Sequence, residues 1–193
     1  MIKTEAFAQV EVASPKALYD WLQKHDAQPQ SVWLVTFKKH VADKYLSVDQ
    51  VLDALIAYGW IDGLRRKLDA DRTMQLIAPR KMQIWAQTYK DRAARLTEAG
   101  TMQPAGLDAI AASKTRGLWD AMADVDALSV PADLAVALAA NPPAAQNFSA
   151  FSPSSRRNML RWIAGAKQPA TRAKRIELTA TLAAKGAKVP QMG

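Results

Sequence analysis

The segment 32–39, VWLVTFKK, restricts the fold more than any other part of the sequence. Its β-branched and aromatic residues are typical of a β-strand. Side chains alternate between the two faces of a strand, and here both faces are apolar, as Leu34 on one and Trp33 and Val35 on the other show. Such a strand must be covered on both sides, so we expect it inside a layered domain.

The segments that follow predict the rest of a small sheet. Runs at 60–68 and 72–78 flank Asp69-Ala70-Asp71, a composition typical of a short polar turn, and together they indicate a hairpin. Helices are expected on either side of the first strand, because Ser14-Pro15 and the capping box from Ser47 to Gln50 are typical helix starts. The second helix is expected to end at Gly59.

From Lys81 onward the pattern predicts helices throughout, and prolines at 131, 142 and 153 mark successive helix starts. The sequence therefore predicts an α+β fold, with a small, mainly antiparallel sheet of 32–39, 60–68 and 72–78 packed with helices and followed by an all-helical C-terminal half. We expect an α+β region over 1–122 and a helical region with a basic face over 123–193, packed as one unit.

Composition places the chain among ordinary globular proteins that lack a membrane span. No apolar run approaches the roughly 20 residues that span a bilayer, and acidic residues interrupt the N-terminus where a signal peptide would be apolar. There are no cysteines, so disulfides and thiolate chemistry are excluded. We expect a cytoplasmic protein without membrane insertion.

Sequence motifs for known chemistry are missing. The two histidines, His25 and His40, lie in or beside loops and have no metal-ligand spacing around them. The chain has no glycine-rich phosphate loop and no GxSxG motif. We therefore predict no catalytic residue, no metal and no cofactor. This argues against an enzyme, although His25 paired with an acid such as Asp26 could still act as a general base.

A candidate ligand site surrounds the sequence GWIDG at 59–63. An indole wall with one carboxylate and one guanidinium could hold an anion, and Arg80 comes directly before a predicted helix, where free N–H groups favour anions. The same groups could instead form an aromatic core braced by an Asp62–Arg80 pair. We expect the site residues to meet where the second helix, the hairpin and the next helix join. They are Trp60, Asp62, Arg65, Arg80 and Trp85.

A second candidate is a basic surface on the last two helices. The net charge of +8 lies in residues 153–193, which contain nine cations and one acid, Glu177. Such a surface could follow phosphates or bind another acidic macromolecule. It could equally be a solvated face neutralised by Asp120, Asp124, Asp126 and Asp133. The patch residues are Arg156, Arg157, Arg161, Arg172, Lys174 and Arg175.

Four stretches in the same order resemble the bacteriocin-protection, YdeI or OmpD-associated (YdeI/OmdA) family. They are Gly59–Gly63, the Pro79-Arg80 step with Trp85, Met102–Gly106, and Lys167–Glu177, and the resemblance runs from about Trp21 to the last helix. It implies a bacterial protein with no established reaction, cofactor or catalytic residue. The family name also implies an association with bacteriocin tolerance and an outer-membrane porin.

These observations lead to three functional hypotheses. The first is a non-enzymatic interaction or stress-tolerance module that binds an acidic macromolecule. The second is a receptor or enzyme for a small anionic ligand with a pocket near Trp60. The third is nucleic-acid binding through the basic C-terminal helices, for which the chain has no helix-turn-helix, zinc-finger or RNP signature.

Overall fold

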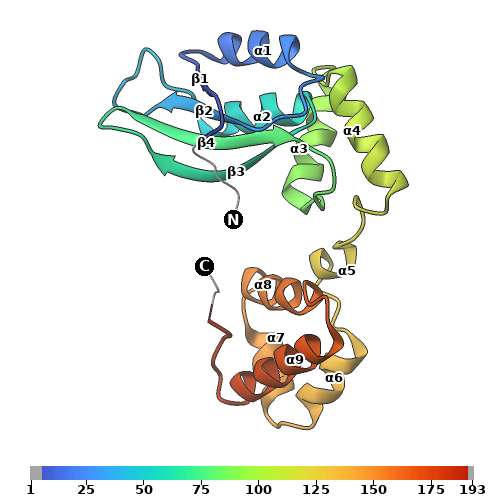
Figure 1. Ribbon diagram of the computed structural model, residues 1–193. Helices are drawn as coiled ribbons and strands as arrows, with labels where there is room; N and C mark the ends of the chain where they lie inside the picture. Colours follow the sequence, from blue (N-terminus) through green and yellow to red (C-terminus); the bar gives the residue numbers. More distant parts are fainter. Residues whose placement is uncertain (1–5, 191–193) are drawn as a thin grey trace. The chain divides into compact units, whose positions relative to one another are not determined.

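The computed structural model describes residues 6–190 and divides the chain into two compact units, one ending at Asp120 and one beginning at Ala121 (Figure 1). We call them the α+β unit and the helical unit. The α+β unit contains β1 (Gln9–Glu11), α1 (Pro15–Lys24), β2 (Val32–Phe37), α2 (Val48–Ala57), β3 (Trp60–Lys67), β4 (Arg72–Pro79), α3 (Gln87–Glu98) and α4 (Pro104–Thr115). The helical unit contains α5 (Ala123–Asp126), α6 (Ala132–Ala139), α7 (Ala144–Ala150), α8 (Pro153–Ala164) and α9 (Pro169–Ala184).

The sheet has the strand order β1-β2-β4-β3. The β2–β4 and β3–β4 pairs are antiparallel, so the predicted α+β fold with a mainly antiparallel sheet is confirmed. Strand β1, which pairs with β2 in parallel, was not predicted. It is three residues long, too short for an alternating apolar pattern to be visible.

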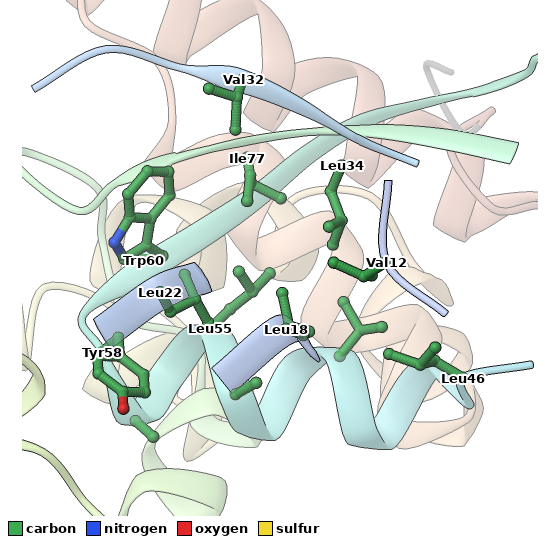
Figure 2. Close-up of a cluster of buried hydrophobic side chains, with 13 residues drawn as sticks. Val12, Leu18, Leu22, Val32, Leu34, Leu46, Leu55, Tyr58, Trp60 and Ile77 are labelled. Atoms are coloured by element: carbon green, nitrogen blue, oxygen red, sulfur yellow. The ribbon is translucent and has the colours of Figure 1, made fainter. Parts of the chain in front are cut away.

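One face of the sheet packs against α1 and α2 to form the main core of the α+β unit (Figure 2). Leu34 and Ile77 from the strands meet Leu22 from α1 and Leu55 from α2, and none of the four is more than 1% exposed. Residues of both faces of β2 are buried from Val32 to Val35, as its two-sided apolar pattern predicts.

The chain after β4 departs from the prediction that everything beyond Lys81 is helical. Residues 81–86 are irregular, and α3 begins only at Gln87. The reason is that tertiary bonds occupy the backbone here, because Trp85 donates its N–H to the Leu118 carbonyl at 3.2 Å. The Trp85 side chain joins a second core cluster with Ile56 and Leu96.

The helical unit has its own core, in which α7, α8 and α9 contribute Phe148, Ile163 and Ala180, none more than 1% exposed. Ser152 caps α8 by accepting a bond from the Ser155 N–H at 3.3 Å. Among residues 6–190, no helix combines the length and the apolar character that crossing a membrane requires.

Candidate functional site

The corner at Gly59–Gly63 is built by close backbone packing. Gly59 ends α2 with a φ of +71°, a conformation that favours glycine. A Cβ on Gly59 would lie 2.8 Å from the Ala105 carbonyl oxygen, and a Cβ on Gly106 would lie 2.2 Å from the Ala57 carbonyl oxygen. The GWIDG and MQPAG motifs therefore touch one another, and their glycines let α4 approach the end of α2.

Trp60 is part of the core rather than a ligand wall. Its side chain is completely buried and packs edge-to-face against Trp21, with ring centroids 5.5 Å apart. It belongs to the cluster under α1 and α2, whereas Trp85 belongs to the cluster that α3 covers. The expected common wall of Trp60 and Trp85 is therefore not formed.

Asp62 is held by a chain of hydrogen bonds on the α1/α2 side of the sheet. It accepts a short bond from the Tyr89 hydroxyl and another from Gln75 Nε2 at 3.0 Å, and Gln75 in turn accepts from Arg65 at 2.7 Å. The Asp62–Arg80 ion pair that was considered as a brace is not formed among the described residues, and the hydrogen-bond donors to Asp62 are Tyr89 and Gln75. Tyr89 and Gln75 were missed in the sequence, where nothing distinguishes them from ordinary helix and strand residues.

Arg80 stacks on two aromatic rings, those of Trp85 and of Tyr89 in α3. Its guanidinium carbon is 4.0 Å from the Trp85 ring centre and 5.3 Å from that of Tyr89. The side chain is only 8% exposed, and this burial lowers the pKa of Arg80 to about 10. Burial and the bond to Asp62 raise the pKa of Tyr89 to about 12. Arg80 and Trp85 thus come together as predicted, and Tyr89 links them to Asp62.

The cations at the corner do not share one direction. Arg65 pairs across the ladder with Gln75, whereas Arg66 pairs with Met74, so their side chains point to opposite faces of the sheet. Arg66 lies over the Trp33 ring at 5.5 Å from its centre. Side chains alternate along a strand, so the three cations at 65–67 cannot all face a single ligand.

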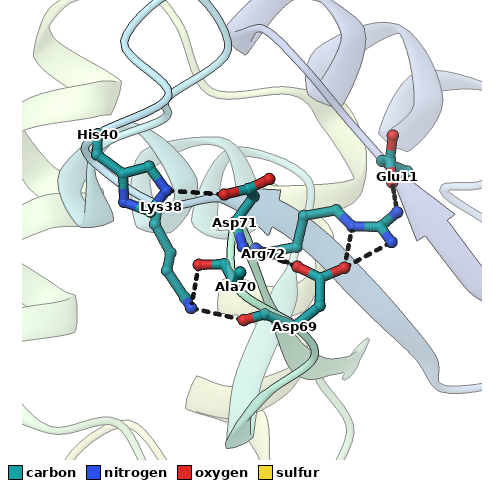
Figure 3. Close-up of polar contacts among 7 residues, drawn as sticks. All are labelled: Glu11, Lys38, His40, Asp69, Ala70, Asp71 and Arg72. Atoms are coloured by element: carbon teal, nitrogen blue, oxygen red, sulfur yellow. Dashed lines mark hydrogen bonds and ion pairs between the residues drawn. The ribbon is translucent and has the colours of Figure 1, made fainter.

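The hairpin turn between β3 and β4 is stabilised by its own side chains, by Lys38 and His40 after β2, and by Glu11 of β1, which pairs with Arg72 (Figure 3). Lys38 Nζ donates to the carbonyls of Asp69 and Ala70, both at 2.6 Å. Asp69 accepts from the Arg72 side chain, and this bond lowers the pKa of the Asp69 carboxyl. His40 contacts Asp71 at 3.0 Å on the exposed side of the turn.

The two histidines have structural contacts. His25 Nδ1 is 2.7 Å from the Trp21 carbonyl oxygen, and its ring stacks on the Trp21 indole at 4.4 Å. Among the described carboxylates, His40 contacts only that of Asp71. Nowhere in residues 6–190 do three or more His, Cys, Asp or Glu side chains gather as a metal site would require.

An open groove of about 580 Å³ lies between α2 and α3. Arg92 donates to Asp49 at 2.7 Å and to Asp53 at 2.5 Å, and Arg95 donates to Asp53 at 2.6 Å. Because these charged side chains pair with each other across the groove, they link the two helices, and we assign them no ligand.

Acidic residues reach the predicted basic patch at two points. Arg157 and Arg161 each lie 3.7 Å from a carboxylate oxygen of Asp126. Arg172 donates bonds of 2.7 and 3.0 Å to the Asp133 carboxylate. Part of the expected neutralisation therefore occurs within the helical unit.

The other patch residues and acids have different surroundings. Arg175 stacks on the Trp162 ring at 5.0 Å and donates to the Trp162 carbonyl. Arg156 lies 5.9 Å from the Phe148 ring centre, and Lys174 is exposed. Asp120, one of the expected neutralising acids, instead pairs with Lys90 in the α+β unit at 3.2 Å. From Ala121 onward the sequence has nine cations and four acids, so a net charge of +5 remains.

The Arg172–Asp133 contact predicts a dependence of stability on pH. The bonds from Arg172 lower the pKa of the Asp133 carboxyl below its usual 3.8. The contribution to stability is therefore present above pH 3.8 and is lost as the pH falls through the lower pKa of the folded state. We expect Arg172→Gln to lower the free energy of unfolding by about 0.5 kcal/mol at pH 7, and wild type and variant to converge in urea unfolding below pH 3.8.

Lys174→Gln is the matched control, because it makes the same charge change on the exposed side of α9. It should leave the unfolding midpoint nearly unchanged at every pH. A difference between wild type and Arg172→Gln that persisted undiminished at pH 2 would contradict the assignment of this stability to the ionised Asp133.

Fold and site together define a two-unit protein: an α+β unit with a hydrogen-bonded polar chain at its corner, and a basic helical unit. Residues 10–109 match the model of the family described as Domain of unknown function (DUF8412), which is just over half of the 193 residues. The chain belongs to this family. Residues 127–186 match the model of the Bacteriocin-protection, YdeI or OmpD-Associated family.

The match over residues 127–186 confirms the resemblance to the YdeI/OmdA family. It covers a shorter part of the chain than the resemblance seen in the sequence, which ran from about Trp21 to the last helix. The Lys167–Glu177 stretch lies inside the matched region, whereas the GWIDG and MQPAG motifs lie inside the region that matches DUF8412. The resemblance to the YdeI/OmdA family is therefore confirmed for residues 127–186, and the earlier motifs lie in the region that matches DUF8412. Neither the curated proteins nor the solved structures give a match to this chain.

Proposed function

We propose that the protein is a non-enzymatic interaction module whose helical unit binds an acidic protein surface. The observation that carries this proposal is the outer face of α9. Lys174, Leu178, Thr181 and Lys185 follow one another at spacings of four, three and four residues, which places them on one side of a helix. All four are exposed, and Leu178 is 43% exposed.

This face combines the two features that protein interfaces use. The lysines at its ends and the net charge of +5 would attract an acidic partner and orient it. Leu178 between them offers apolar surface that a partner protein can bury. A leucine side chain has neither charge nor a hydrogen-bond donor for a phosphate backbone. In addition, Arg157, Arg161 and Arg172 already lie against carboxylates. An acidic protein therefore fits better than a nucleic acid.

The proposal includes a cytoplasmic location and a role in bacteriocin or antimicrobial tolerance. The support for tolerance is the description of the family that matches residues 127–186. Within the proposal, the chain acts indirectly, by holding an acidic partner, and it needs no catalytic group for this.

The charge requirement is tested by binding to polyglutamate, with heparin and duplex DNA as comparison polyanions, over a series of salt concentrations. We expect retention on polyglutamate at low salt and a loss of at least about tenfold in affinity for Lys174→Glu/Lys185→Glu. The control is Lys24→Glu/Lys39→Glu, which makes the same charge change on exposed lysines of the α+β unit and should bind almost like wild type.

Two results would overturn the proposal. One is failure of all three polyanions to bind at low salt. The other is binding to DNA that is much tighter than binding to polyglutamate. In that case the logarithm of the affinity should fall with the logarithm of the salt concentration by about 0.9 per neutralised phosphate, as is typical of duplex DNA. The second result would support the nucleic-acid hypothesis instead.

A further inference from the structure

Arg80 is a buried cation whose hydrogen-bonding capacity is largely unused. The side chain is 8% exposed, and Nε is buried without a partner among the described residues. The guanidinium makes one hydrogen bond within this part of the chain, from Nη1 to the Ile84 carbonyl at 3.5 Å. That distance is at the limit for a hydrogen bond. Buried guanidinium groups are normally paired with carboxylates or several carbonyls.

The neighbouring groups do not supply the missing partner. Trp85 and Tyr89 contact the guanidinium through their ring faces, which favours the cation but leaves its N–H edge free. Asp62 is the nearby carboxylate, but it accepts from Tyr89 and Gln75 and makes no hydrogen bond or ion pair with Arg80 among the described residues. Because Nε is buried, an external acceptor would reach the guanidinium through its Nη atoms, and it would replace only the long bond to Ile84.

The chain that leaves Arg80 exposes apolar side chains in a fixed position. Met82 is 65% exposed and Ile84 is 42% exposed. The segment is held at both ends, because Arg116 donates to the Lys81 carbonyl at 2.9 Å and Trp85 donates to the Leu118 carbonyl at 3.2 Å. Large apolar side chains held in water by an ordered segment suggest a surface that another molecule covers.

The charges around this segment favour an anion. Lys81 and Arg116 are exposed beside the same segment. A negatively charged ligand would therefore gain from the field of several cations, even though Asp62 offsets part of the charge of Arg80.

We propose that the segment 80–85 binds a small organic acid that has a carboxylate and an apolar body. The carboxylate accepts hydrogen bonds from the Arg80 guanidinium, and the apolar body covers Ile84 and Met82. An inorganic anion would satisfy Arg80 and leave both apolar side chains in water. The site is confined to the α+β unit and does not depend on the function proposed for α9.

The test is an NMR titration at constant ionic strength with three probes: hexanoate, acetate and inorganic phosphate. The amide signal of Ile84 and the indole signal of Trp85 report binding at the site. We expect hexanoate to bind about tenfold more tightly than acetate, which is less than complete burial of its four additional methylenes would give. Phosphate should bind no more tightly than acetate.

Substitutions separate the two halves of the site. Arg80→Gln should abolish binding of hexanoate and acetate, and Arg80→Lys should weaken both. Met82→Ser/Ile84→Ser should leave acetate binding unchanged and reduce the advantage of hexanoate to less than about threefold. Val136→Ser is the control, because Val136 is 70% exposed but lies in the helical unit.

If Arg80→Gln does not fold, Met82→Ser/Ile84→Ser still tests the proposal. Met82 and Ile84 are exposed, so replacing them with serine should not disturb the core. The proposal is wrong if hexanoate binds no better than acetate to wild type. It is also wrong if Val136→Ser and Met82→Ser/Ile84→Ser change hexanoate binding equally, or if phosphate binds more tightly than hexanoate.

Discussion

Replacing Gly106 with alanine should destabilise the α+β unit by about 3 kcal/mol and lower its Tm by on the order of 10 °C. The added Cβ would lie 2.2 Å from the Ala57 carbonyl oxygen and 2.8 Å from the Ala57 carbonyl carbon. These atoms cannot move away easily, because the same carbonyl accepts the Gln103 N–H at 3.0 Å. The clash must outweigh the roughly 1 kcal/mol by which alanine is otherwise favoured over glycine inside a helix.

Gly63→Ala is the control for this prediction. Its Cβ would lie 3.3 Å from the Leu76 carbonyl oxygen, so a small adjustment of the exposed strand is sufficient. We expect a change below about 1 kcal/mol in thermal or urea unfolding. If Gly106→Ala were neutral or stabilising, α4 would not pack on the end of α2 through this glycine, and the structural account of the MQPAG motif would be wrong.

The sequence was sufficient to predict the sheet where the alternating pattern was long. The three predicted strands, including both strands of the hairpin, agree with β2, β3 and β4 to within two residues. It was not sufficient at residues 81–86, where local propensity favours a helix. There the Trp85 N–H bonds to Leu118, 33 positions further along the chain, and no local pattern contains such a contact.

In the candidate site, too, some features follow from the sequence and others depend on long-range contacts. The approach of Arg80 to Trp85 follows from chain order, because β4 ends at Pro79 and returns the chain toward α3. The partner of Asp62 does not follow from it. A tyrosine hydroxyl from α3 is the donor instead of the guanidinium, and sequence spacing does not determine which of the two groups reaches the carboxylate.

For the basic surface, the sequence predicted the members and the total charge but not the individual ion pairs. The sequence named Asp126 and Asp133 among the acids that could neutralise this face, but it did not reveal that Asp126 lies near Arg157 and Arg161, or that Asp133 pairs with Arg172. These pairings remove arginines from the surface that was predicted to bind anions. The exposed lysines of α9 are left as its principal charged groups, and for this reason the proposal centres on Lys174 and Lys185.

The second large effect on stability is expected at Trp60, the tryptophan of the GWIDG corner. Trp60→Ala should destabilise the α+β unit by about 4 kcal/mol, because it leaves a cavity in the core below α1 where the indole packs against Trp21. Trp60→Phe should cost only about 1 kcal/mol. The reason is that Trp60 Nε1 is buried without a hydrogen-bond partner among the described residues, so phenylalanine removes an unpaired polar group together with part of the ring.

Trp85→Phe is the matched comparison, because this indole is equally buried but donates from Nε1 to Ser113 Oγ at 2.8 Å and stacks on Arg80. Phenylalanine loses this hydrogen bond and offers a weaker face to the cation, so we expect a cost of about 2 kcal/mol, larger than that of Trp60→Phe. Urea unfolding of the three variants measures the order. If Trp60→Phe were as destabilising as Trp60→Ala, the Trp60 N–H would have a partner, for example a buried water molecule, and the corner would contain a polar contact that the packing alone does not show.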